Sequence, residues 1–149
     1  MKKRFFLAFA LLGLLPGAAF ALCGLSVAGL NFSPYDVLAP APNDTVGNLT
    51  ITCDEVPPPN VTVSIGASPA SGGFSPRRMR GPFDLLDYNI YTEARHANVW
   101  GDGTNSTNMV SVRVPRNNPA TLKIYGRIPP QQNVSAGSYA DTLVVTITW

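Results

Sequence analysis

The chain has one histidine and two cysteines, and these small numbers exclude several kinds of site. With His96 as the only histidine, a Ser-His-acid triad has one possible base, and no Gly-x-Ser-x-Gly motif positions a nucleophile. A zinc site needs more ligands, and residues 102–108 lack the glycine and glutamate spacing of a calcium loop. We therefore predict no enzyme, no metal and no cofactor, and expect His96 to be a surface loop residue.

Positive charge is scarce beyond the first residues. The chain has 11 Lys and Arg against 9 Asp and Glu, a formal net charge of +2. Removal of residues 1–21 takes away Lys2, Lys3 and Arg4, which leaves 8 against 9, or −1. Such a chain has no basic field for nucleic acid and no polybasic membrane anchor.

The N-terminus has the layout of a bacterial-type secretory signal peptide. Basic residues 2–4 precede an apolar run over residues 5–15 and the small-residue site Ala19-Phe20-Ala21. The run is too short to span a bilayer as a mature helix, and no later stretch approaches that length. We predict cleavage after Ala21 and export of one domain, residues 22–149, without a membrane span.

Cys23 and Cys53 form an even pair in an exported chain. Because the periplasm is oxidising, we predict a disulfide between them. A loop of about 30 residues would stabilise the fold by roughly 3.6 kcal/mol through restriction of the unfolded chain. Lipidation of Cys23 is the alternative, but it needs a small residue where Leu22 stands.

No segment has a sustained helical period, and the apolar residues alternate as in half-buried β-strands. The alternation predicts strands over residues 49–53, 61–65, 88–92 and 122–128, separated by Gly- and Pro-rich turns. Residues 83–87 are interpreted as a short helical turn. Short strands at regular spacing favour an antiparallel sandwich.

The last nine residues, 141–149, are predicted to form an alternating apolar strand. One face has Leu143, Val145, Ile147 and Trp149, and the other has Val144, Thr146 and Thr148. An open apolar edge is an association surface unless another polypeptide covers it, so we predict that the first row faces a chaperone or a partner strand. The alternative is an ordinary core strand of a complete sandwich, which needs the same alternation.

The charged clusters in the middle of the chain are interpreted as solvated turns and loops. They are the acidic pairs Asp84 with Asp87 and Asp54 with Glu55, and the three arginines Arg77, Arg78 and Arg80. A carboxylate pair can act as acid and base, and an arginine cluster can bind an anion or a glycan. Charges in loops are usually solvated, and further polar anchors for a cleft are not evident.

Seven ordered blocks resemble a known family over nearly the whole mature chain. They are LNFSPYD (30–36), LTITC (49–53), RRM (77–79), YNIYTEA (88–94), WGDGT (100–104), YGRIP (125–129) and AGSYADTLVVTITW (136–149). In these blocks the chain resembles the spore coat protein U domain family, which contains the archaic, Csu-type chaperone-usher pilins.

The resemblance implies an all-β, Ig-like antiparallel β-sandwich that lacks one strand. The resemblance also implies that a periplasmic chaperone fills the gap first, and that a segment of a neighbouring pilin subunit fills it after assembly at an outer-membrane usher. Family members that polymerise carry an apolar donor segment before the first cysteine, whereas cleavage after Ala21 leaves only Leu22 there. A strand needs about five or six residues. We therefore expect a tip or terminating subunit that accepts a strand without donating one.

The predicted function is a structural or adhesive pilus subunit at the cell surface, acting in adhesion and biofilm formation. One alternative is an extracellular carbohydrate-binding module that uses Trp100, Tyr88, Tyr91 and Tyr125. Another is a surface coat protein outside any fibre. A binding module would be a stable monomer when expressed alone, whereas an incomplete sandwich would need a chaperone.

Overall fold

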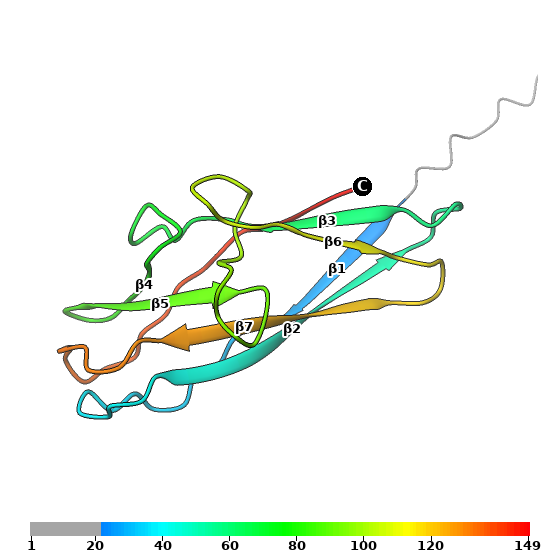
Figure 1. Cartoon of the computed structure of the whole chain (residues 1–149). Helices are drawn as coiled ribbons and strands as arrows, with labels where there is room; N and C mark the ends of the chain where they lie inside the picture. Colours follow the sequence, from blue (N-terminus) through cyan, green and yellow to red (C-terminus); the bar gives the residue numbers. More distant parts are fainter. Residues whose placement is uncertain (1–21) are drawn as a thin grey trace, which may run out of the picture.

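The structure, a computed structural model, describes residues 22–149, and every regular element in this range is a β-strand (Figure 1). The strands are β1 (Cys23–Ala28), β2 (Asn43–Cys53), β3 (Asn60–Ile65), β4 (Arg77–Arg80), β5 (Leu85–Tyr91), β6 (Val110–Arg113), β7 (Ala120–Ile128) and β8 (Val145–Thr148). The predicted signal peptide and its cleavage site lie outside the described residues. Within residues 22–149, no helix is long and apolar enough to cross a membrane.

The strands form two sheets that share one core. The larger sheet has the order β1-β2-β7-β5-β4 and the smaller has the order β6-β3-β8, with all neighbouring strands antiparallel. Leu49 and Ile51 of β2 and Val61 and Val63 of β3 belong to the same buried cluster. The predicted all-β antiparallel sandwich is confirmed.

Strand alternation explains which side chains enter this core. In β3, Val61, Val63 and Ile65 are buried, while Thr62 and Ser64 are half-buried on the opposite face. The predicted strands at 49–53, 61–65 and 122–128 lie in β2, β3 and β7, and the strand at 88–92 corresponds to most of β5. A period of two residues therefore located the central strands correctly.

The predicted helical turn over residues 83–87 is wrong. Residues 85–87 begin β5, and Arg78 and Met79 of β4 pair with Asp87 and Leu86. Leu86 is buried by this pairing. The strand is stabilised by β4, a neighbour that local sequence does not specify.

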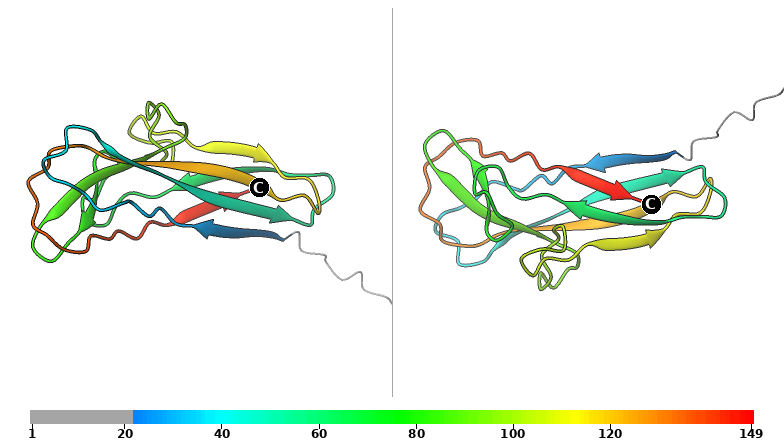
Figure 2. Two further views of the ribbon diagram at one scale, coloured as in Figure 1. Left: turned by 90° about the horizontal axis from the view of Figure 1, so that it is seen from below. Right: turned by 90° about the horizontal axis from the view of Figure 1, so that it is seen from above.

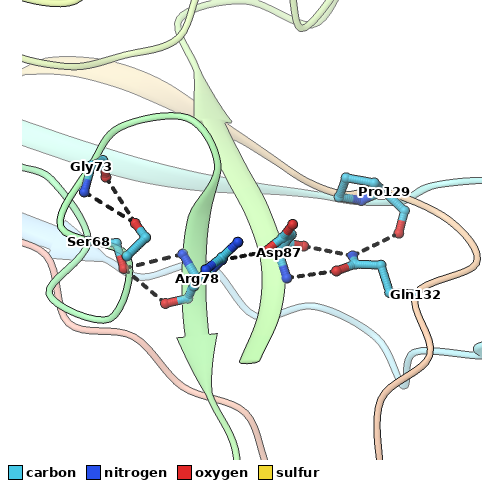
Figure 3. Close-up of polar contacts among 7 residues, drawn as sticks. Ser68, Gly73, Arg78, Asp87, Pro129 and Gln132 are labelled. Atoms are coloured by element: carbon cyan, nitrogen blue, oxygen red, sulfur yellow. Dashed lines mark hydrogen bonds and ion pairs between the residues drawn. The ribbon is translucent and has the colours of Figure 1, made fainter. Parts of the chain in front are cut away.

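Gln132 extends the hydrogen bonding of β5 beyond the end of β7 (Figure 3). Its side-chain oxygen accepts from the backbone nitrogen of Asp87 at 2.8 Å, and its Nε2 donates to the Asp87 carbonyl oxygen at 2.8 Å. The Asp87 carboxylate accepts a hydrogen bond from Nε of Arg78 at 2.8 Å (Figure 3). A side-chain amide thus satisfies backbone groups that β7 no longer reaches.

Candidate functional site

A groove opens between the two sheets on the side of the sandwich where β1 and β8 lie. These strands are edge strands of the larger and the smaller sheet, and both views of Figure 2 show them along the same side. The cavity has a volume of about 730 Å³. Its apolar lining includes Val27, Leu30, Phe32, Ile65, Met79, Leu86, Ile90, Ile124, Ile128, Leu143 and Val145.

The β8 edge of the groove has backbone groups that point away from the sheet. Gly66 of the segment after β3 donates its backbone N–H to the Val144 carbonyl oxygen at 2.8 Å. Hydrogen-bonded and non-bonded pairs alternate in an antiparallel ladder. The backbone N–H and C=O groups that point to β3 are therefore those of Val144, Thr146 and Thr148. The backbone groups of Val145 and Ile147 therefore point to the open edge.

The β1 edge has the same property. The backbone nitrogen of Asp54 donates to the Leu22 carbonyl oxygen at 3.3 Å, which identifies the hydrogen-bonded pairs of the β1–β2 ladder. The backbone groups of Leu25 and Val27 consequently face away from β2. In residues 22–149, β1 pairs only with β2 and β8 pairs only with β3, so two open edges border the groove.

The alternation predicted for residues 141–149 is confirmed, but the strand is shorter than predicted and covers only Val145–Thr148. Leu143, Val145 and Ile147 are half-buried and pack against the core, whereas Val144 on the opposite face is 70% exposed. Trp149 is 48% exposed at the end of the row. The proposed role of this row in binding a partner remains a prediction.

The wall of the groove opposite β8 comes from a segment that the strand pattern of the sequence does not place at the site. Residues 29–35 contribute Leu30, Phe32 and Tyr35 to the lining. The Phe32 ring packs edge-on against Tyr88, with centroids 6.3 Å apart, and the Tyr35 hydroxyl donates to the Pro129 carbonyl oxygen at 2.8 Å. The spacing of Leu30 and Phe32 was a local signal for this wall, but the segment has no regular strand structure.

The predicted disulfide is confirmed. Cys23 and Cys53 are bonded, and they are directly opposed in the β1–β2 ladder. The bond ties the start of edge strand β1 to the end of β2. It therefore holds one border of the groove to the interior of the larger sheet.

The family model of the Spore Coat Protein U domain matches residues 13–146. The chain belongs to this family. Protein U of Myxococcus xanthus is 31% identical over 132 residues, which cover 80% of this chain and 71% of that protein.

A solved structure of another protein is similar in fold to this Spore Coat Protein U domain. It is the CsuC-CsuE chaperone-tip adhesion subunit pre-assembly complex from archaic chaperone-usher Csu pili of Acinetobacter baumannii. The TM-score is 0.63 at 19% sequence identity, and the match covers 87% of this chain. This chain spans 40% of the matched chain's length, and the likeness is one of fold.

The interpretation of the three arginines of this Spore Coat Protein U domain as a solvated loop is wrong, because all three lie in strand β4 and Arg77 is fully buried. Its guanidinium donates to the carbonyl oxygens of Ile65, Gly66 and Trp100 and lies 5.3 Å from the Phe74 ring centroid. Burial lowers the pKa of Arg77 to about 10. Carbonyl acceptors from segments distant in sequence offset the cost of burying this cation, which the local sequence suggested would be solvated.

The interpretation of His96 as a surface residue is also wrong, although the residue does lie in a loop. Its side chain is 8% exposed and packs edge-on against Tyr91 and Tyr125, with centroids 5.1 Å and 6.3 Å away. Its Nε2 lies 4.0 Å from Oδ1 of Asp44. Aromatic side chains on β5 and β7 cover the imidazole, and their proximity was not visible in the sequence.

Two of the four aromatic residues considered for carbohydrate binding belong to the core. Trp100 is fully buried and donates Nε1–H to the Val63 carbonyl oxygen at 3.1 Å, and Tyr88 is also buried. A flat aromatic surface for a sugar needs exposed ring faces. Trp100 and Tyr88 do not supply them.

The acidic residues of the predicted turns have separate structural partners. Asp87 pairs with Arg78, whereas Asp84 accepts from the backbone nitrogen of Ser135 at 2.7 Å. Hydrogen bonding from the Ser135 side chain, and then this backbone bond, lower the pKa of Asp84. Asp102 accepts from the backbone and hydroxyl of Thr104. Across residues 22–149, no three His, Cys, Asp or Glu side chains gather as metal ligands would.

Proposed function

We propose that this chain is an exported, non-enzymatic structural subunit of an archaic chaperone-usher pilus. The groove between β1 and β8 holds an extended strand of a periplasmic chaperone. After transfer at an outer-membrane usher, a strand of a neighbouring pilin replaces it. The subunit passes through the periplasm to the cell surface, where the fibre supports adhesion and biofilm formation.

One observation carries this proposal: an apolar groove lies between two open strand edges whose backbone groups point outward. An inserted strand would satisfy the backbone groups of Val145 and Ile147 and cover the apolar lining at the same time. This is the physical basis of recognition by β-strand addition. Family membership and the shared fold of the Csu complex support the same partner type.

A tip or terminating position in the fibre is part of the proposal. All residues of β1, from Cys23 to Ala28, pair with β2, and Cys23 is bonded to Cys53. Donation of β1 to another subunit would therefore require breaking the larger sheet. The predicted cleavage after Ala21 would leave only Leu22 ahead of this strand.

The acceptor function is tested by expressing the full chain, with its signal peptide, in a bacterium with and without a periplasmic chaperone from the same pilus type. We expect aggregation or degradation of the chain alone, because an unfilled apolar groove is exposed, and soluble complex on co-expression. A pilin donor-strand peptide should raise the melting temperature by mass action. A chaperone-free monomer with a sharp cooperative melt, unaffected by the peptide, would contradict the proposal.

The tip position is tested by immunogold labelling of assembled fibres. Label confined to fibre ends is expected, together with a failure of the purified mature chain to form homopolymers. Regular label along the shaft would contradict the tip position while leaving the acceptor function intact.

A further inference from the structure

A single carboxylate interrupts the apolar wall of the groove. Asp141 is half-buried in the lining and lies two residues before Leu143, on the same alternating face as Leu143 and Val145. Its Oδ2 accepts from the Tyr88 hydroxyl at 2.7 Å, and its Oδ1 accepts from the backbone nitrogen of Thr142 at 2.9 Å. Both donors are neutral groups.

No cation is paired with Asp141 in residues 22–149. The ion pairs in this range join Arg78 with Asp87, and Arg127 with Asp44. Arg80 is the closest cationic residue by backbone pairing, since its nitrogen donates to the Ala140 carbonyl oxygen at 2.8 Å. Its exposed side chain makes no ion pair with Asp141. The Asp141 charge is close enough to the buried Arg77 to oppose part of the lowering of its pKa by burial, but the guanidinium bonds to other acceptors, so the carboxylate has no directly bonded cation.

Tyr88 holds this carboxylate in a defined orientation. The tyrosine is buried, its ring packs against Phe32, and its hydroxyl points to Asp141. Burial, followed by the bond to Asp141, raises the pKa of Tyr88, so the hydroxyl keeps the proton that it donates. The charge is consequently fixed at one point along the groove.

A strand that fills the groove removes water from Asp141. Desolvation of a carboxylate that has no directly bonded cation is costly, whereas a charge-paired hydrogen bond offsets that cost. We infer that the segment bound in this groove carries a lysine or arginine facing Asp141, among otherwise apolar inward-facing residues, and that this pair selects the segment and its register. The inference rests on the proposed acceptor function.

The chemistry of a long basic side chain suits this position. Its methylene groups can pack along the apolar wall near Phe32 and Leu143, while the charged end reaches Asp141. A register shift of two residues would keep the same side chains inward but would move the cation away from the carboxylate. An acidic residue at this point would place two negative charges side by side, and this repulsion would weaken binding of segments that carry one.

The test uses pilin donor-strand peptides that carry one lysine, norleucine or glutamate, moved in turn through each inward-facing position. At one position, the lysine peptide should displace the chaperone from its purified complex with this chain at a concentration at least about tenfold lower than the glutamate peptide. Asp141→Asn should abolish that preference. Asp102→Asn, at an exposed loop carboxylate outside the groove lining, should preserve it. A preference that is equal at all positions, or that survives Asp141→Asn, would overturn the inference.

Salt dependence gives a second measurement on the unmodified chain. Binding of the best lysine peptide should weaken with added salt more than binding of its norleucine counterpart, because only the former forms an ion pair. Equal salt dependence would also overturn the inference. Failure of every peptide to bind, including the unmodified donor segment, would instead contradict the acceptor function itself.

Discussion

Nη1 of Arg77 donates to Oδ1 of Asn89 at 2.8 Å, and both residues are buried. The same guanidinium binds the carbonyl oxygens of Ile65 and Gly66, where β3 ends. Gly66 in turn bonds to Val144, next to the open edge of β8. One buried arginine therefore connects β4 and β5 to the strand that borders the groove.

Arg77→Met should destabilise the domain by about 3–5 kcal/mol, because it leaves several buried acceptors without a donor. Arg77→Lys should recover only part of this loss, since an ammonium cannot reproduce the planar array of donors. Urea unfolding of the peptide-filled domain measures both effects. Arg78→Met is the matched control, with an expected loss below about 1 kcal/mol from its exposed pair with Asp87. Equal losses at the two arginines would contradict this assignment.

Removal of the disulfide by the double substitution Cys23→Ser and Cys53→Ser should cost about 3.6 kcal/mol, as estimated from the sequence separation of 30. Edge strand β1 should be affected most, because the bond anchors its first residue. Hydrogen exchange with and without reductant would show whether β1 amides lose protection before those of β7. Two free thiols in folded protein, detected by mass spectrometry, would disprove the bond.

Val145→Asp and Ile147→Asp should each abolish capture by the chaperone. An aspartate at either position would place an unpaired charge in the half-buried row that packs toward the core. Thr146→Asp is the control on the opposite, exposed face of the same strand and should have a milder effect. Co-purification with the chaperone distinguishes the variants. Equal capture of all three would mean that this row does not face the partner.

Gly126→Ala should narrow the groove without unfolding the domain. A Cβ at Gly126 would lie 2.8 Å from Cδ1 of Leu30 and 2.8 Å from Cζ of Phe32. These flexible side chains line the groove and can move only by occupying part of it, so peptide affinity should fall by about tenfold, in the range of an overpacking cost. Gly73→Ala, with no neighbour within 4 Å, should leave affinity unchanged. Calorimetric titration would reveal the difference, and unaltered binding to Gly126→Ala would refute it.

The pair of Asp44 with Arg127 should make a small contribution that disappears in acid. The hydrogen bond from Arg127 lowers the pKa of Asp44 below its ordinary value of 3.8. Stability from this pair is therefore present above pH 3.8 and is lost as the pH falls below it. Asp44→Asn should cost less than about 1 kcal/mol at neutral pH, because the pair is partly exposed, and should flatten the acid limb of stability. Urea midpoints across this range would test the slope, and an unchanged slope would argue against the pair.

Much of the fold was predictable from local alternation. Val61, Val63 and Ile65 identify β3, and Leu143, Val145 and Ile147 identify the face of the last strand, because successive side chains of a strand must point to opposite sides. The disulfide followed from the even cysteine count and the expected export. At the candidate site, the inward face of the last strand followed from its alternation and its role stays a prediction, whereas the wall at residues 29–35 was not predicted, since that segment lacks regular pairing.

The sequence by itself determined the strand class, the Cys23–Cys53 bond and the alternation of the terminal strand. Only the tertiary structure decided that Arg77 is buried and that the His96 side chain is largely covered. Arg77 bonds to Trp100, which is distant in sequence, and His96 packs against Tyr91 of strand β5. The tertiary structure also decided that β1 and β8 border one groove with Asp141 in its wall. Burial and charge pairing depend on three-dimensional proximity, whereas strand periodicity depends only on neighbours along the chain.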